Sequence, residues 1–427
     1  MLMYFEANGS LVRRYAASWR AFGWLTVLLL VACGSSDQNG GEPFDPSTAF
    51  SERDSLGIPI RTTEFAAAML PLGWTIEGSP TQQIGPADGD GFVRIVGVVA
   101  IEGGPVAVLD ADLLHLFLYD ASGRQVARSG GTGEGPGEFG ERGRSPTVVA
   151  APELADSVMI YDYGLRRVTR FSIESGAFGG SERMELPEGV SEILGSVGKH
   201  ILTRERTPFT AEDYQQSGPR ESGMSYSWID LATSEHSILG TWRVSLDYRI
   251  PPGDISSGPL GLRGNIPLAT RPMAVLSSEG PIVSSGSSIE FRRFDLDGRL
   301  AAISRLDAPR RPITATARRG LRDLWLVGAR DSVQSGRIFD AIPLPDSMPA
   351  VTNLQVDVDG WVWVELPEWD PHVAPTWVVF DEEGRARGSI AVPPGLELQW
   401  VGRESILAVW TDELGRQFVR RHALLRH

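Results

Sequence analysis

The sequence predicts an all-β protein, a six-bladed β-propeller of four-stranded antiparallel blades, and three observations lead to this fold. First, the stretch 351–393 contains four short β-type runs joined by tight turns, with Asp359-Gly360 and Glu383-Gly384 at two of the turns. Second, weaker copies of this pattern recur along the chain, and one such meander cannot bury its own apolar face. Third, the last copy has only three runs, so the isolated run near Trp74 is expected to close the ring.

The predicted blades follow one another from residue 92 to the C-terminal end. Their expected ranges are 92–129, 145–184, 190–242, 271–306, 351–393 and 396–425. A polar loop at 207–223 is expected to split the third blade. Residues 312–342 show a helical spacing of apolar side chains that ends at Pro343 and Pro345, which predicts one or two short helices outside the ring.

The N-terminal segment has the features of an export signal. Three arginines lie within 11–20, and an apolar run of about twelve residues follows at 21–32, which suits a signal peptide, whereas a membrane-spanning helix needs about 20 residues. The run ends in Leu30-Val31-Ala32-Cys33-Gly34, which resembles the lipobox of bacterial lipoproteins. That resemblance implies cleavage before Cys33, the only cysteine, and diacylation of its thiol.

These features define the expected domains and location. Residues 1–32 are a lipoprotein signal peptide, 33–64 the lipidated cysteine with a flexible tether, and 65–427 the propeller. We expect an exported protein that is lipid-anchored at the cell envelope, at the outer membrane or the periplasmic face. The net charge of −14 disfavours contact with nucleic acid or anionic lipid surfaces, so the anchor is the only expected membrane contact, and we expect a monomer.

Two segments carry a further resemblance. Residues 110–120 and 162–172 share one frame, in which an acidic residue and a short turn precede a β run that contains an aromatic residue. This frame resembles the NHL-type repeat, and the glycine-rich loop 130–139 is similar to a loop of bacterial envelope proteins with six-bladed propellers. The chain therefore resembles the six-bladed β-propeller family of envelope lipoproteins with NHL-like repeats.

The short motifs in the sequence predict no cofactor-binding site. Gly135 to Gly140 matches G-x-G-x-x-G, but no βα unit precedes it, and Glu134 and Glu138 would repel a phosphate. The Asp-x-Asp-Gly sequences ending at Gly298 and Gly360 fit hairpin turns better than calcium loops. The histidines are scattered singly and no G-x-S-x-G elbow occurs, so we predict no catalytic and no metal-binding residues; a calcium or zinc ion in the channel, held by distant blades, stays open.

A binding face is expected where the inner hairpin loops and the glycine-rich loop meet. Its candidate residues are polar, charged or aromatic and fall in or near these loops: Asp110, Asp112, Glu134, Glu138, Asp162, Arg166, Arg204, Trp369, Asp370 and His372. The competing interpretation is that the carboxylates only cap turns.

The predicted function is a non-enzymatic binding or interaction platform for an envelope protein, a peptide or a glycan. The alternative is a metal-dependent hydrolase or lyase, similar to lactonases, that uses the central channel. That resemblance requires Glu, Asn, Asp or His ligands in the channel, and Asn265 and Asn353 are the only asparagines after the tether. The metal content of the purified protein would separate the two hypotheses.

Overall fold

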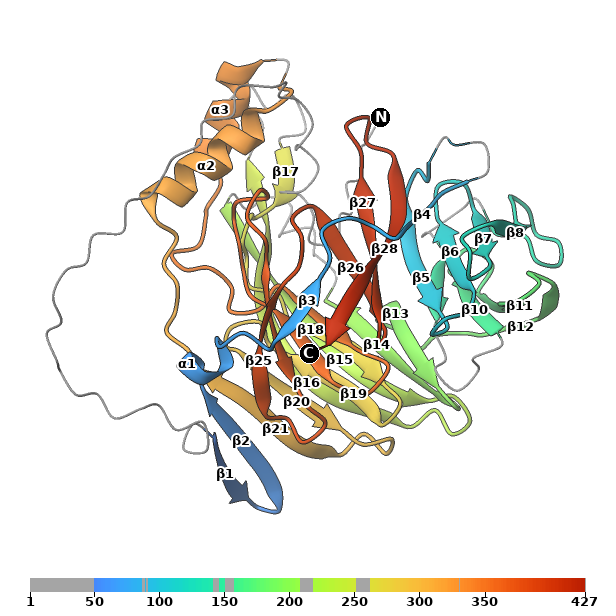
Figure 1. Ribbon diagram of the computed structural model, residues 1–427, viewed down its shortest axis with the longest axis horizontal. Coiled ribbons are helices and arrows are strands. Elements are labelled where there is room, and N and C mark those ends of the chain that lie inside the picture. The colour runs from blue at the N-terminus through green and yellow to red at the C-terminus, as the bar shows by residue number, and fades with distance from the viewer. Residues whose placement is uncertain are drawn as a thin grey trace, which may run out of the picture.

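Six sheets arranged in a ring make up most of the chain (Figure 1). The structure is a computed structural model that describes residues 50–86, 89, 91–140, 146–149, 157–207, 218–250, 262–329 and 331–426. The predicted signal peptide, Cys33 and the tether before Phe50 lie outside the described residues.

Three blades have the predicted four strands in chain order. Blade one is β5 (Ile95–Ala100), β6 (Val106–Asp110), β7 (His115–Tyr119) and β8 (Gln125–Gly130). Blade two is β9 (Thr147–Val149), β10 (Ser157–Asp162), β11 (Arg167–Ser172) and β12 (Phe178–Arg183). Blade five is β22 (Asn353–Val356), β23 (Val362–Glu365), β24 (Thr376–Phe380) and β25 (Ala386–Ala391).

The other three blades carry additions. Blade three is β13 (Val190–Val197), β14 (His200–Arg206), β15 (Gly218–Asp230) and β16 (His236–Ile250), with β17 (Leu262–Asn265) as a fifth strand. Blade four is β18 (Met273–Ser277), β19 (Gly280–Ser284), β20 (Glu290–Phe294) and β21 (Leu300–Asp307), followed by β2 (Ile58–Glu64) and β1 (Phe50–Ser55). Blade six is β26 (Leu396–Val401), β27 (Ser405–Thr411) and β28 (Gln417–Arg426), completed by β3 (Trp74–Ile76), with β4 (Gln82–Ile84) also on β28.

The six blades form a closed ring. The first strand of each blade contacts the first strands of both neighbouring blades, so β5, β9, β13, β18, β22 and β26 surround one axis. In blade six, Ile76 pairs with Leu424 and Trp74 with Arg426, which joins strand β3 to the C-terminal strand β28. The predicted propeller and its closure by the run near Trp74 are confirmed.

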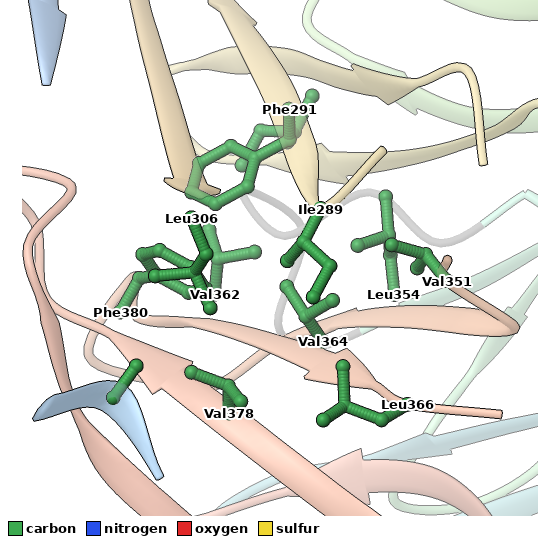
Figure 2. Close-up of a cluster of buried hydrophobic side chains, with 12 residues drawn as sticks. Ile289, Phe291, Leu306, Val351, Leu354, Val362, Val364, Leu366, Val378 and Phe380 are labelled. Carbon is green, nitrogen blue, oxygen red and sulfur yellow. The ribbon is translucent and has the colours of Figure 1, made fainter. Parts of the chain in front are cut away.

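Strict alternation of side chains places the cores between blades. In blade five, Val362, Val364 and Phe380 point toward Phe291 and Leu306 of blade four (Figure 2). The intervening Trp363 and Trp377 point the other way, toward blade six. A strand with two buried faces has a nearly continuous apolar sequence, which explains the hydrophobic stretches 362–366 and 376–380. Each fully buried large apolar side chain stabilises the fold by about 1.5–3 kcal/mol.

The turns use the predicted chemistry. Asp357 Oδ1 accepts hydrogen bonds from the amides of Asp359 and Trp361, and Gly360 adopts φ 82°. Asp295 accepts from the amide of Arg299, and Gly298 adopts φ 75°. Both Asp-x-Asp-Gly sequences are therefore hairpin turns.

Residues 50–64 differ from the prediction of a flexible tether. They form the β1–β2 hairpin, and β2 runs parallel to β21 with Ile60 opposite Ile303 and Glu64 opposite Asp307. Ile60 and Thr63 are buried in this arrangement. Because β21 would otherwise be the open outer edge of blade four, the hairpin covers an edge that could pair with another chain.

The predicted loop at 207–223 is shorter than expected. Residues 218–223 belong to β15, which pairs with β16 along nearly its whole length, and residues 208–217 lie outside the described part. The strands of blade three thus extend beyond the usual blade height. Alternation is weak in this sequence because Gly218, Pro219 and Gly223 interrupt it, so the extension has little sequence signal.

The predicted helical insertion is present and covers this extension. Helices α2 (Ala315–Leu326) and α3 (Ser332–Asp340) are capped by the side chains of Thr314 and Asp331. Their buried side chains Leu321 and Phe339 pack on Tyr248 of blade three, and Figure 1 shows both helices beside β17. A third, four-residue helix, α1 (Phe65–Ala68), follows β2. We call the face that carries α2 and α3, and the loops between second and third strands, the upper face; the opposite face is the lower face.

Candidate functional site

Two predicted site residues, Asp110 and Asp162, are buried turn caps. Asp110 Oδ2 accepts from the amide of Val93 at 2.7 Å, and its Oδ1 accepts from the amides of Asp112 and Leu113. Asp162 is arranged in the same way, with Gly140 at 2.7 Å and the amides of Gly164 and Leu165 as donors. Each carboxylate holds the chain segment that leads into its blade. Their oxygens are occupied, so they serve the fold.

Asp112 and Arg166 form solvent-exposed ion pairs. Asp112 contacts Arg94 at 2.7 Å, and Arg166 contacts Glu185 at 3.0 Å. Exposed pairs of this kind stabilise a protein by about 0–1 kcal/mol.

The glycine-rich loop is held from below by Arg167. This guanidinium donates to the carbonyl oxygens of Glu134, Gly135 and Glu138 at 3.1, 2.8 and 2.6 Å. The Glu138 carboxylate in turn accepts from the amide of Gly135 at 2.8 Å. The loop is therefore a fixed part of the upper face.

Trp369, Asp370 and His372 lie together in the loop between β23 and β24. Trp369 packs against the helical insertion, beside Leu268. Asp370 Oδ1 accepts from the amide of His372 at 2.9 Å. These three residues belong to the upper face, where they contact their own loop and the helices.

Among the predicted site residues, Arg204 is the one that lies in a cluster of charged side chains. It lies on β14 and pairs with Glu192 on β13, the innermost strand of blade three. Two residues further along the same face of β14, Arg206 contacts Asp247 at 2.6 Å and donates to Ser222 Oγ at 3.1 Å. The Arg204 side chain is 25% exposed and the Arg206 side chain 30% exposed, so a ligand could reach both guanidinium groups.

Tyr226 and Arg271 complete this cluster from β15 and from the segment that enters blade four. Tyr226 is buried opposite Arg204 and donates its hydroxyl proton to the carbonyl oxygen of Pro272 at 2.8 Å. Burial raises the pKa of Tyr226 to about 12, so the phenol stays protonated. We refer to Glu192, Arg204, Arg206, Tyr226, Asp247 and Arg271 as the seam cluster, because they lie where blades three and four meet.

Arg271 is the unusual member of the seam cluster. Burial lowers its pKa most, and the guanidinium groups of Arg204 and Arg206 lower the pKa further, whereas Tyr226 and the Asp247 carboxylate act in the opposite direction. Both neighbours have a carboxylate partner, whereas Arg271 forms no ion pair with any residue that the structure describes. A partly buried cation among like charges is costly unless an anion joins it.

A groove of about 420 Å³ lies beside the seam cluster on the upper face. Its walls are mostly apolar and include Trp242, Ile266, Ala269, Pro343 and Pro345, with the hydroxyl groups of Thr270 and Ser285 among them. Thr270 directly precedes Arg271, and Val244 in the wall lies opposite Ser222, which holds Arg206. The groove thus places an apolar surface next to an excess of guanidinium groups.

Sequence reasoning found Arg204 but missed the rest of the seam cluster. The alternating Arg204 and Arg206 on one β strand were a usable signal, because period-2 spacing puts both on the same face. Glu192 and Asp247 lie on the first and fourth strands of blade three, and Arg271 lies in the segment that enters blade four, so the three come from segments up to 79 residues apart.

Within the described residues, no group of three or more His, Cys, Asp or Glu side chains is arranged to hold a metal ion. The lactonase-like alternative stays a prediction. Helices long and apolar enough to cross a membrane are likewise not found in the part of the chain that the structure describes.

With fold and site in view, the chain can be compared with known proteins. Its architecture makes it a six-bladed β-propeller. No protein-family model and no curated protein matches the sequence.

Several solved structures share the fold at low identity. They include a predicted exported protein of Bacteroides fragilis (11% identity, 83% of this chain and 96% of that chain, TM-score 0.41) and a member of the DUF4221 family from Bacteroides vulgatus (10%, 83% and 99%, TM-score 0.42). The virginiamycin B lyase of Staphylococcus aureus is similar at 8% identity (82% and 99%, TM-score 0.35). Such distant similarity assigns no function, which has to be inferred from the residues of this chain.

Proposed function

We propose that this protein is an exported, lipid-anchored binding protein that holds an organic anion at the seam of blades three and four. The observation that carries the proposal is Arg271, a partly buried guanidinium beside two others and without an ion pair among the described residues. A bound carboxylate, sulfonate or phosphate would supply the missing counter-charge, and guanidinium groups suit such groups because they donate two parallel hydrogen bonds.

The charge balance of the seam cluster supports an anionic ligand. Three arginines face two carboxylates there, although the whole chain has a net charge of −14. The local excess of positive charge is therefore opposite to the average of the molecule, and it would concentrate an anion at this one place.

The adjoining groove supports a ligand with an apolar part. Trp242, Ile266 and the prolines 343 and 345 offer apolar surface, and a groove of about 420 Å³ is in the range of small-ligand sites. Peptides with a free carboxylate and acidic glycan fragments satisfy this description, in line with the predicted peptide or glycan partner.

The binding test uses two fluorescent probes that differ only in charge. The purified full chain is titrated with 1-anilinonaphthalene-8-sulfonate and with N-phenyl-1-naphthylamine, the same molecule without the sulfonate. We expect the sulfonate to bind at least about tenfold more tightly. Equal affinity for the two probes would mean that the groove binds apolar surface only and would contradict the proposal.

Arg271→Gln is the matching variant, and Arg183→Gln is its control. Arg183 lies on β12, outside the groove, and its side chain is 76% exposed and pairs with Glu185. We expect Arg271→Gln to weaken sulfonate binding about tenfold and to raise the melting temperature of the ligand-free protein, because an unpaired charge is removed. Unchanged binding together with a lower melting temperature would show that Arg271 only supports the fold.

The lipid anchor is tested separately. We expect the full chain, produced in a bacterial host fed with an alkyne-labelled fatty acid, to incorporate the label, and Cys33→Ser to abolish labelling. The same substitution should release the protein from the membrane fraction, because the acyl chains of the diacylated thiol supply the membrane affinity. Labelling that persists in Cys33→Ser would contradict the assignment of the anchor.

A further inference from the structure

A second cavity lies on the opposite, lower face, where blades four and five meet the N-terminal hairpin. Its volume is about 270 Å³, and its charged and polar lining includes Arg61, Ser277, Glu279, Arg293, Asp295 and Glu382. These residues come from β2, from β18, β20 and two loops of blade four, and from the β24–β25 loop. The cavity does not share a residue with the seam cluster or with the groove beside it.

Arg293 forms the inner end of this cavity. It lies on β20 with only 9% of its surface exposed, next to the core shown in Figure 2 through Phe291. One guanidinium nitrogen, Nη2, donates to the carbonyl oxygen of Asp381 in blade five at 3.0 Å. Its Nε is buried and has no hydrogen-bond partner in the described part of the chain. A buried N–H without an acceptor is costly, and a ligand oxygen would satisfy it.

The outer end of the cavity carries the opposite charge. Glu279 and Glu382 are exposed, and neither forms an ion pair with a cation that the structure describes. Arg61, the other cation in the lining, is already paired with Glu52 at 2.9 Å. The cavity therefore offers one guanidinium at its base and two available carboxylates at its mouth.

We propose that this cavity is a binding site for a small zwitterion, an α-amino acid with a basic side chain. Its carboxylate accepts from Arg293 at the base, where a guanidinium recognises a carboxylate in a defined geometry. Its ammonium groups lie near Glu279 and Glu382 at the mouth. The volume is slightly below the range of drug-sized ligands, which fits a molecule as small as a free amino acid.

The test is isothermal titration calorimetry of the purified full chain with three related probes. L-lysine carries both charges, cadaverine is the same molecule without the carboxylate, and hexanoate lacks the amines. We expect L-lysine to bind, and the other two to bind at least about tenfold more weakly. Cadaverine binding as tightly as L-lysine would reduce the site to an acidic surface, and no heat with L-lysine at about 10 mM would mean that the cavity binds no amino acid.

Variants at both ends keep the proposal testable. Arg293→Met removes the guanidinium while keeping much of the side-chain stem, and we expect it to abolish the preference for L-lysine over cadaverine. Because Arg293 is buried, this variant could be unstable, so Glu279→Gln with Glu382→Gln changes only exposed positions. We expect the double variant to weaken L-lysine binding at least about tenfold and the neighbouring Glu383→Gln to leave it unchanged. Unchanged binding in the double variant would refute the site.

Discussion

Removal of the Trp74 side chain is expected to weaken the closure of the ring. Trp74 lies on the short closing strand β3 and stacks on Trp361 of blade five with ring centroids 5.4 Å apart. The guanidinium of Arg426, its partner on β28, lies 4.2 Å from the centroid of the Trp74 ring. Three residues of β3 pair with β28, so a large share of the contact between the chain ends comes from this one side chain.

The expected loss follows from these contacts. A tryptophan buries about 150–250 Å² when enclosed, and Trp74 is partly exposed, so about 100 Å² is lost, worth about 2.5 kcal/mol. The aromatic pair adds about 0.5–1.5 kcal/mol, and the cation–π contact about 0.5–1 kcal/mol. Because an unfolded chain already buries part of this surface, we expect Trp74→Ala to lower the free energy of unfolding by about 3 kcal/mol.

The assay combines urea unfolding with hydrogen exchange of β28. Trp410→Ala is the control, because Trp410 is also partly exposed and contacts both Phe418 and Arg420, but on a hairpin within blade six. Only Trp74→Ala should accelerate exchange at residues 424–426. A loss below about 1 kcal/mol, or equal exchange of these amides in both variants, would refute the conclusion that Trp74 secures the closure.

Three further outcomes are expected. Burial lowers the pKa of His422, so below about pH 6.5 the unfolded chain binds more protons than the folded one, and the free energy of unfolding falls as the pH drops. His422→Gln should make that fall shallower in urea unfolding between pH 7 and pH 5. Identical pH profiles of the two proteins would contradict this expectation. Arg167→Met should speed hydrogen exchange in the glycine-rich loop about tenfold or more, whereas Arg170→Met, on the same strand, should not. Lys199 holds the pKa of Asp230 at about 2, mainly through a hydrogen bond, so Lys199→Met should raise that pKa toward 3.8 in an NMR titration. An unchanged pKa would mean that the backbone amide donors, and not Lys199, lower the pKa of Asp230.

Much of the propeller could be predicted because its information is local. The turn at Gly360 and the alternation of Val362, Trp363 and Val364 appear within a few residues of sequence, and the missing strand of the last blade pointed to Trp74. The β1 strand could not be predicted in this way, because Ser51 to Ser55 is polar throughout, with three charged residues, and is exposed.

The candidate sites depend on contacts between blades, and that limits sequence reasoning. Asp110 and Asp162 were recognisable as turn residues, and the structure shows them capping turns. Arg271 and Arg293, in contrast, look like ordinary surface arginines in a chain whose basic residues are nearly all arginine. Only the packing of blade four between its neighbours reveals that Arg271 is partly buried and that the buried Nε of Arg293 lacks a hydrogen-bond partner among the described residues.

The N-terminal hairpin also determines how the molecule would respond to a mechanical pull. A force on the chain before Phe50 first acts on the pair Phe50–Thr63, at the open end of the hairpin, so β1 would peel off one pair at a time. The force would then reach β2, whose five registered positions, from Ile60 to Glu64, lie parallel to β21 and would be loaded together in shear. The hairpin would thus yield as an extensible element, while the closing strand β3, further along the chain, carries no load until β2 has separated.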